Sequence, residues 1–325
     1  MAKAEDESPG PDSVLAKVSH FVITSYNFLR PVSILQVIIA NICLFASVLV
    51  ENPQLFKLSV LLKAFPGLLA MIFANAYYAG INQIYDVDID KVNKPYLPIA
   101  AGNLSVKQAW YLMIFYVLAG LLILWLMNAD TITTSLYCFG LFLATFYSAP
   151  PFRFKISSLA TAIVLPLNAG FIQILGILYT TRVSLGLPFL WSPQIVFFLT
   201  FVPVFYLVIS FVKDIIDVEG DMKYNIRTFA AIFGPRITIF LGTGILLVNY
   251  IRAIALAIYM PQAFKLHIMV PAHSLLALWL IFEAKMAEKA NYTKEALRDV
   301  LPWKLVEIEE MTTLFLIVLE VFATL

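Results

Sequence analysis

Charged residues are scarce in this chain. Asp, Glu, Lys and Arg make up 13% of its 325 residues, whereas hydrophobic residues make up 61%. A soluble globular domain carries charge on about a quarter of its residues, so this composition excludes an ordinary soluble domain. Together with a mean hydropathy of +0.86, it indicates a protein that crosses a membrane several times.

Cysteine and histidine are also rare. Cys43 and Cys138 both lie in apolar runs, which excludes a disulfide framework and a metal-thiolate motif. The three histidines, His20, His267 and His273, are scattered and form no ligand cluster. The net charge of +1 provides no basic excess, so we expect no nucleic-acid partner.

The apolar residues fall into nine runs, each close to the roughly 20 residues that a membrane-spanning helix needs. This pattern predicts an all-α fold, a polytopic helical bundle with about nine transmembrane helices. The expected spans are about 32–50, 60–84, 105–127, 131–148, 158–180, 193–213, 236–260, 265–283 and 305–325.

The first 20 residues are polar and acidic. They lack the basic and then apolar start of a signal peptide, and they are not arginine-rich like a transit peptide. We therefore expect a polar N-terminal tail over 1–20 and a transmembrane domain over 21–325. This start is compatible with a chain that begins after a removed targeting segment.

Basic residues are distributed unevenly between the predicted loops. The loops after the second, fourth, sixth and eighth spans carry 14 of them, and the opposite loops carry four. Lysine and arginine are enriched in loops on the cytoplasmic side of membranes, so this asymmetry supports the order of the spans.

Two clusters of acidic residues follow the second and the sixth spans, hence on the same, basic side. Their members recur at helical spacing and share one face of a helix, with Asn82, Asp86 and Asp90 in the first cluster and Asp214, Asp217 and Asp221 in the second. Asp88 and Glu219 lie off these faces. Carboxylates at the mouth of a span are costly unless a cation compensates them, and Mg²⁺ takes one or two carboxylates together with phosphate oxygens. We therefore predict Mg²⁺ ligands among Asp86, Asp90, Asp214, Asp217 and Asp221.

Basic side chains flank both acidic clusters. Acids that hold Mg²⁺ beside lysine and arginine form a diphosphate site, because the metal bridges phosphate oxygens and the cations neutralise the remaining charge. The alternative is that these basic residues only anchor loops on the positive side. The residues predicted to bind a diphosphate are Asn82, Lys91, Lys94, Arg153, Lys155 and Lys213.

The paired acidic motifs resemble the signatures of the UbiA-type intramembrane prenyltransferases. The string Asn-Gln-Ile-Tyr-Asp-Val-Asp-Ile-Asp-Lys-Val-Asn-Lys-Pro over 82–95 and the string Asn-Tyr-Thr-Lys-Glu over 291–295 resemble the plant plastid branch, which prenylates homogentisate and other phenols. The resemblance covers roughly residues 25–325. It implies an enzyme of a plastid membrane, in contact with membrane lipid, whose helices surround a central cavity capped on the motif side.

The resemblance also implies the reaction. An allylic prenyl diphosphate would transfer its prenyl group to an aromatic, phenolic acceptor and release diphosphate with the help of Mg²⁺. An aromatic face near the acids, that of Tyr147 first and Tyr85 second, would shield the allylic cation. Asp217 is the first candidate to take the phenol proton. The residues expected to act in catalysis are Asp86, Asp90, Asp217, Asp221 and Tyr147.

Three positions depart from the homogentisate enzymes that the chain resembles. Val32-Ser33 stands where they have His-Thr, Ala169 stands where they have an arginine, and Val306-Glu307 stands in place of Phe-Tyr. All three lie outside the acidic motifs. We therefore expect a phenol other than homogentisate as the acceptor, and a role in specialised plant metabolism.

Other functions stay open at this point. The chain can be a homogentisate prenyltransferase of tocopherol or plastoquinone synthesis, another UbiA-type transferase with a porphyrin or glycerol-phosphate acceptor, or an intramembrane terpene cyclase. A cation-coupled transporter is disfavoured, because transport sites usually lie near the membrane midplane on broken helices. The acceptor, the prenyl chain length, the regiochemistry and the oligomeric state do not follow from the sequence.

Overall fold

The computed structural model describes residues 14–292, and these residues fold into helices. The described part of the chain contains no strand, and a single isolated bridge joins Ser157 to Arg227. The predicted all-α class is therefore confirmed. The first elements are α1 (Val14–Phe28), α2 (Pro31–Glu51), α3 (Leu58–Tyr85), α4 (Val87–Asn93), α5 (Val106–Leu126) and α6 (Thr131–Ser148).

The second half of the fold begins with a continuous helical stretch in which α7 (Ser158–Leu165) passes through the π-helical segment η3 (Pro166–Ile172) into α8 (Gln173–Ser184). It continues with α9 (Pro193–Val212), α10 (Val218–Lys223), α11 (Phe229–Tyr259) and α12 (Leu266–Lys289). A short 3₁₀ turn, η2 (Phe154–Ile156), precedes α7.

Seven stretches among the described residues are long and apolar enough to cross a membrane: α2, α3, α5, the α7–η3–α8 stretch, α9, α11 and α12. The chain is thus a multi-pass membrane protein. The 18-residue helix α6 lies where the fourth span is predicted but is not among these seven. The predicted ninth span, 305–325, lies outside the described residues, so the count of nine stays a prediction.

Polar capping residues fix the starts of several helices. Ser105 and Gln108 form a reciprocal capping box at α5, in which the Ser105 hydroxyl accepts from the Gln108 backbone N–H at 3.2 Å. Asp130 caps α6, Ser192 caps α9 and Thr228 caps α11. Helix α1 begins at Val14, inside the predicted N-terminal tail.

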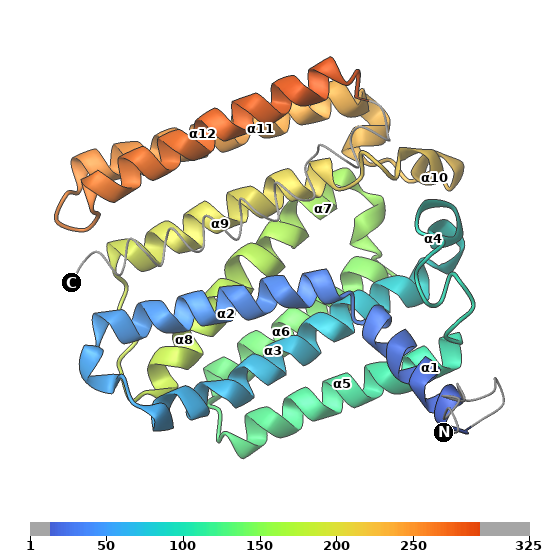
Figure 1. Ribbon diagram of the computed structural model, residues 1–325, viewed down its shortest axis with the longest axis horizontal. Helices are drawn as coiled ribbons and strands as arrows, with labels where there is room; N and C mark the ends of the chain where they lie inside the picture. Colours follow the sequence, from blue (N-terminus) through green and yellow to red (C-terminus); the bar gives the residue numbers. More distant parts are fainter. Residues whose placement is uncertain (1–13, 293–325) are drawn as a thin grey trace, which may run out of the picture.

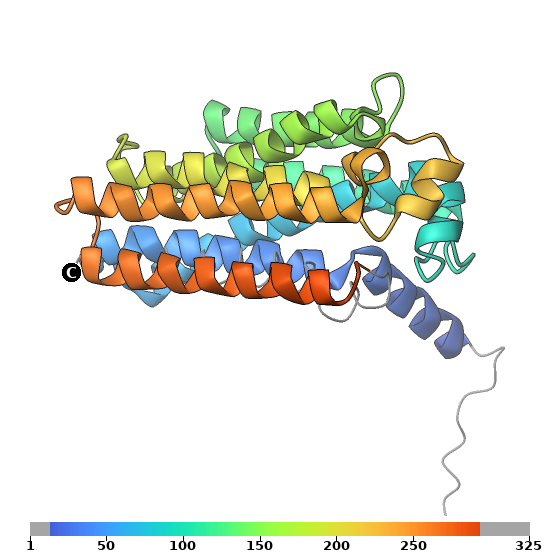
Figure 2. The ribbon, with the colours of Figure 1, turned by 90° about the horizontal axis from the view of Figure 1, so that it is seen from above.

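The long helices run along a common direction (Figure 1). Helix α3 packs against α2, α5 and α6, whereas α9 packs against α7, η3 and α11, and α12 covers α11. The largest buried apolar cluster joins residues of α2, α8, α9, α11 and α12. The short helices α4 and α10 lie at one end of the bundle, and α1 extends from the same end (Figures 1 and 2).

The π-helical segment η3 contacts α9 at very short range. A Cβ atom placed on Gly170 would lie 2.6 Å from the Cα of Pro203 on α9, so only glycine fits there. π-helical turns are uncommon and occur frequently at functional sites. This segment lines one side of the cavity described below.

Candidate active site

Both acidic clusters lie where a membrane-spanning helix ends and a short helix begins. Helix α3 ends at Tyr85, Asp86 follows, and α4 starts at Val87. Helix α9 ends at Val212, a turn follows, and α10 starts at Val218. The two acidic clusters therefore occupy corresponding positions at the same end of the bundle, as the basic asymmetry of the loops predicts (Figure 1).

The short helices α4 and α10 pack directly against each other. The Gly220 backbone N–H donates to Asn93 Oδ1 at 3.2 Å, and a Cβ atom on Gly220 would lie 2.3 Å from that oxygen. Tyr224 donates its hydroxyl hydrogen to the Asp88 carbonyl at 3.0 Å. A larger residue at position 220 would displace the Asn93 side chain and break this contact between the two short helices.

All five predicted metal ligands are buried. Their exposed fractions lie between 5% and 9%, for Asp86, Asp90, Asp214, Asp217 and Asp221. By contrast Asp88 and Glu219, which fall off the helical faces, are exposed. Helical spacing therefore separates the inward-facing acids from the outward-facing ones.

Asp86 is the most heavily paired acid of the first cluster. It accepts hydrogen bonds from Asn82 Nδ2 at 3.0 Å, from Arg153 Nη2 at 3.2 Å and from Lys155 Nζ at 2.5 Å. Arg30 in turn donates to Asn82 Oδ1 at 3.1 Å. Burial lowers the pKa of Lys155 to about 8, and the neighbouring Asp86 opposes that shift.

Lysine side chains connect and neutralise the second cluster. Lys94, which follows α4, forms an ion pair with Asp217 from the other half of the chain. Lys213 pairs with its neighbour Asp214. Thr228 Oγ1 donates to Asp221 Oδ2 at 3.3 Å. The two acidic clusters and the basic residues predicted from the sequence therefore form one connected site.

Asp90 and Asp221 form no ion pair with a basic side chain of the described residues, so a divalent cation meets no internal competitor at these two acids. Asp90 Oδ2 is buried and has no hydrogen-bond partner among the described residues. Burial raises the pKa of Asp90 to about 6 and that of Asp221 to about 7. A cation beside these carboxyl groups would favour their ionised forms.

No group of three acidic, histidine or cysteine side chains in residues 14–292 forms a ready-made metal site. Magnesium does not need one, because it takes one or two carboxylates and completes its shell with water and phosphate oxygens. The donor set therefore fits Mg²⁺, with Asp86 and Asp90 on one side and Asp214, Asp217 and Asp221 on the other.

Two arginines of the site have unusual backbones. Arg30 and Arg153 have φ angles of 51° and 43°, in the left-handed region that non-glycine residues rarely adopt. Each keeps a buried Nε that has no partner in the described part of the chain. Strained conformations of this kind cluster at functional sites. Unpaired guanidinium donors are suited to the oxygens of a phosphate group.

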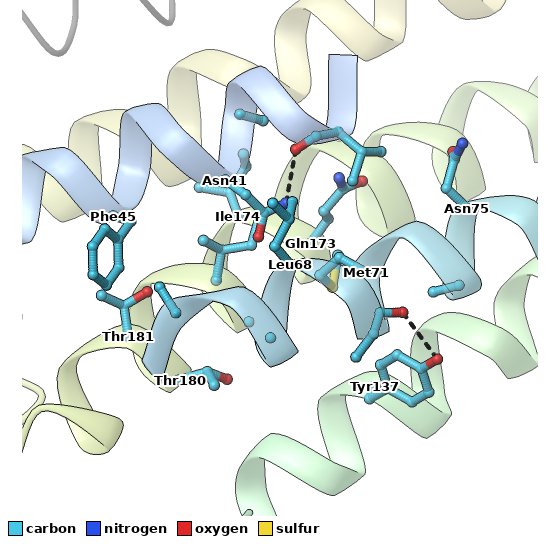
Figure 3. Close-up of a pocket in the computed structure, with 18 of the residues that line it drawn as sticks. Asn41, Phe45, Leu68, Met71, Asn75, Tyr137, Gln173, Ile174, Thr180 and Thr181 are labelled. Atoms are coloured by element: carbon cyan, nitrogen blue, oxygen red, sulfur yellow. Dashed lines mark hydrogen bonds between the residues drawn. The ribbon is translucent and has the colours of Figure 1, made fainter. Parts of the chain in front are cut away.

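Aromatic side chains connect the charged end of the bundle to a cavity. Tyr147 is buried and lies next to Lys213, and its ring centroid is 5.9 Å from that of Tyr78. Tyr78 and Arg30 line a cavity of about 730 Å³ between α2, α3, α6 and the α7–η3–α8 stretch (Figure 3). Most of its lining is apolar. Arg30 and Tyr78 therefore connect the charged site to one end of a cavity that an apolar chain can occupy.

Two predicted residues do not join the site. Lys91 pairs with Asp88 at 3.0 Å on the exposed side of α4, because the helix ends two residues later and only Lys94 turns inward. The ring of Tyr85 packs edge-on against Trp110, with centroids 6.3 Å apart, and only its carbonyl contacts Arg153. We therefore withdraw diphosphate binding for Lys91 and a cation-shielding role for Tyr85.

Three residues of the site were absent from the predicted set. Arg30, Tyr78 and Asn93 all reach it through contacts with residues distant in the sequence. Only Arg30 carries a local signal, since it precedes a proline at the start of the first span.

The departures from the homogentisate pattern fall at different places. Ser33 and Ala169 line the cavity, whereas Val32 is exposed. Positions 306 and 307 lie outside the described residues.

Comparison with known proteins agrees with this site. The sequence matches the UbiA prenyltransferase family over residues 40–301. It is 48% identical over 288 residues to the probable chloroplastic homogentisate phytyltransferase 2 of Oryza sativa subsp. japonica, covering 89% of this chain and 76% of that protein. It is 39% identical over 320 residues to the chloroplastic 2-acylphloroglucinol 4-prenyltransferase of Humulus lupulus, covering 97% and 77%.

The fold also has a solved counterpart. A UbiA homolog from Archaeoglobus fulgidus, solved with GPP and Mg²⁺ bound, superimposes with a TM-score of 0.66 over 92% of this chain and 99% of that one. At 19% identity this likeness establishes the fold alone. From the family match and its relatives, the chain belongs to the UbiA prenyltransferase family.

Proposed function

We propose that this protein transfers a prenyl group from an allylic prenyl diphosphate to a phenolic acceptor and releases diphosphate. The observation that carries the proposal is the joint placement of two buried acidic clusters and their basic partners beside Arg30 and Tyr78, which line one end of a mainly apolar cavity. This arrangement holds a charged diphosphate at the rim and an apolar chain inside. Its chloroplastic relatives support a plastid membrane as the location.

The donor binds through its diphosphate. Lys155 and Arg153 lie beside Asp86, and Lys94 and Lys213 lie beside the second acidic cluster. The two acidic clusters would hold Mg²⁺, which would supply positive charge to stabilise the leaving diphosphate. Binding of GPP and Mg²⁺ by the archaeal homolog supports this role. Arg30 joins the set, because it lines the cavity and its Nε has no partner among the described residues.

The transfer step needs a dry, electron-rich surrounding for the allylic carbon. As the carbon–oxygen bond to the diphosphate breaks, the basic side chains stabilise the charge that develops on the leaving group. The faces of Tyr147 and Tyr78 stabilise positive charge on the prenyl fragment. The allylic carbon then bonds to a ring carbon ortho to a phenol hydroxyl, and a carboxylate of the site takes the released proton. Asp217 remains the first candidate for that proton.

The acceptor proposed is a phenol other than homogentisate. Homogentisate carries a carboxylate, and a buried anion requires a cation or several donors. Ala169 lines the cavity at the position where the homogentisate pattern has an arginine. The identity to the acylphloroglucinol enzyme of Humulus lupulus supports a neutral phenol, whereas the identity to the rice homogentisate enzyme supports the alternative. We further propose that residues 21–325 form the transferase domain.

The experiment uses membranes that contain the full chain. Labelled dimethylallyl, geranyl, farnesyl and geranylgeranyl diphosphates are each supplied with a panel of phenols, with Mg²⁺ or with EDTA. We expect a prenylated phenol and an equal amount of diphosphate, both dependent on Mg²⁺. Release of diphosphate with a cyclised hydrocarbon, and no prenylated phenol, would replace the proposal by a terpene cyclase. No release of diphosphate from any donor would reject it.

A further inference from the structure

Five amide side chains among the described residues line the cavity. Gln36 lies six residues after Arg30 on α2, and the other four lie farther from the charged site. They come from three sides: Asn41 on α2, Asn75 on α3, Asn168 in η3 and Gln173 at the start of α8. Figure 3 shows three of them, Asn41, Asn75 and Gln173, around the pocket. We call the four residues the amide cluster. Nothing in the prenyl-transfer step described above uses them.

The depth of the amide cluster follows from helix geometry. Asn75 lies seven residues before Asn82, about 10 Å along α3, and Asn41 lies 11 residues after Arg30, about 16 Å along α2. The hydrogen bond from Arg30 to Asn82 joins the two helices near the charged end. The amide cluster therefore lies roughly 10–16 Å below the charged rim.

Several polar atoms of the amide cluster have no hydrogen-bond partner among residues 14–292. Asn75 Nδ2 is shielded from solvent and makes no hydrogen bond to any described residue. The structure records no side-chain hydrogen bond for Gln173 within residues 14–292. Asn41 Nδ2 donates to the Val37 carbonyl of its own helix at 2.8 Å, which leaves its Oδ1 available. Amides in an apolar cavity are costly unless they are hydrogen-bonded, so a polar ligand group is expected between them.

A prenyl chain does not provide that group, since it has no hydrogen-bond donor or acceptor. A phenolic acceptor does. Its reacting ring carbon must come within about 3.5 Å of the allylic carbon just below the diphosphate. The substituents on the far side of the ring then lie one ring diameter deeper, toward the amide cluster.

The charge of the residues that line the cavity indicates whether the acceptor is charged or neutral. Among the residues that the structure describes, the charged side chains that line the cavity are Arg30 at the rim and Lys63 near the start of α3, at the opposite end. At the level of the amide cluster the lining is neutral, and Ala169 stands next to Asn168. Amides match hydroxyl and carbonyl groups, whereas a carboxylate at this depth would lack a cation.

We infer that the amide cluster is the recognition site for the distal polar groups of an uncharged hydroxylated or acylated phenol. The inference rests on the proposed function. It assigns Asn75, Gln173 and Asn41 to acceptor specificity, separate from the residues that bind the donor.

Steady-state kinetics of the full chain in membranes test the inference, with donor and acceptor varied separately. The variants are Asn75→Leu and Gln173→Leu, which remove an amide at similar volume, and Asn75→Gln, which keeps one. Met71→Leu is the matched control, because Met71 lines the same cavity one turn from Asn75 on α3. The acceptor panel contains an acylphloroglucinol and homogentisate.

We expect both leucine variants to raise the KM for the acylphloroglucinol roughly five- to tenfold, the effect of one lost neutral hydrogen bond. The KM for the prenyl diphosphate should stay within about twofold, Asn75→Gln should recover part of the loss, and Met71→Leu should change neither constant. The two leucine variants should also reduce the preference for the acylphloroglucinol over homogentisate.

Other results overturn the inference. A higher KM for the donor with an unchanged acceptor KM would assign the amides to the path of the prenyl chain. If the KM values for donor and acceptor rise equally, and do so in Met71→Leu as well, the substitutions cause a packing defect. Unchanged constants in both leucine variants would show that the acceptor does not reach the amides. In each case the wild-type chain still prenylates phenols, whereas failure of the proposed function would remove that activity itself.

Discussion

Removal of the basic side chains beside Asp86 should weaken the use of the prenyl diphosphate and leave the use of the phenol largely intact. Arg153 and Lys155 both contact Asp86, at 3.2 and 2.5 Å, from the segment just before α7. Their exposures differ, because the side chain of Arg153 is 33% exposed and that of Lys155 is 8% exposed. The loss in kcat/KM for the prenyl diphosphate should therefore be larger in Lys155→Ala than in Arg153→Ala.

The expected sizes follow from the strength of a charge-assisted hydrogen bond, about 1.5–3 kcal/mol. Solvent screens the partly exposed Arg153, so its loss should lie near the lower limit, about tenfold in kcat/KM for the donor. The buried Lys155 should lie near the upper limit, on the order of 100-fold. Asp86 has three donors, and either variant leaves it the bond from Asn82 and the bond from the other basic side chain.

The assay measures kcat/KM for the prenyl diphosphate at saturating phenol, and KM for the phenol at saturating donor. Lys91→Ala is the matched control, since Lys91 lies on the same side of the membrane but pairs with the exposed Asp88. It should change neither constant. Equal losses for donor and phenol in Lys155→Ala, with a lowered melting temperature, would show a folding effect. A Lys91→Ala loss as large as that of Lys155→Ala would refute the site geometry.

Three further predictions concern the metal, the fold and the acceptor. EDTA should abolish turnover. In a metal titration, Asp90→Asn should raise the Mg²⁺ concentration needed for half-maximal activity at least tenfold. Asp88→Asn changes an exposed acid and should match wild type. Gly170→Ala should lower the free energy of unfolding by about 1–3 kcal/mol in a melting assay, because the added Cβ clashes with α9. Gly176→Ala should leave stability unchanged, because a Cβ there meets nothing within 4 Å. Equal melting temperatures for the two variants would contradict the contact between η3 and α9. In a competition assay, Ala169→Arg should raise the use of homogentisate relative to a neutral phenol, because the arginine supplies a cation for the carboxylate. If the wild-type enzyme has its highest kcat/KM on homogentisate, the proposed acceptor is refuted.

Local periodicity was sufficient to find the inward-facing acids. A spacing of four residues placed Asp86 and Asp90 together and set Asp88 apart, and the buried and exposed positions agree. The same pattern did not predict the break between α3 and α4 at Asp86, whose φ and ψ angles are −112° and 12°. Because α4 starts at the next residue, the helical face continues across the break.

Contacts between segments that are distant in the sequence could not be predicted from local spacing. Lys91 and Lys94 both follow Asp90, and only the chain turn after Asn93 makes Lys94 the partner of Asp217, 123 positions away. The amide cluster also has no sequence signal, because a single asparagine in an apolar run is compatible with many environments. The amide cluster is recognised only in the structure, where residues of α2, α3, η3 and α8 line the same cavity.

The ion pairs of the site have a thermodynamic consequence for the order in which its ligands bind. Lys155, Lys94 and Lys213 already neutralise Asp86, Asp217 and Asp214 in the protein alone, so a divalent cation must compete with internal cations. A diphosphate attracts those same lysines and releases the carboxylates. Metal and donor therefore assist each other, and by linkage each raises the affinity of the other by the same factor. The protein is expected to hold Mg²⁺ weakly until a prenyl diphosphate arrives, so that metal and donor enter the site together.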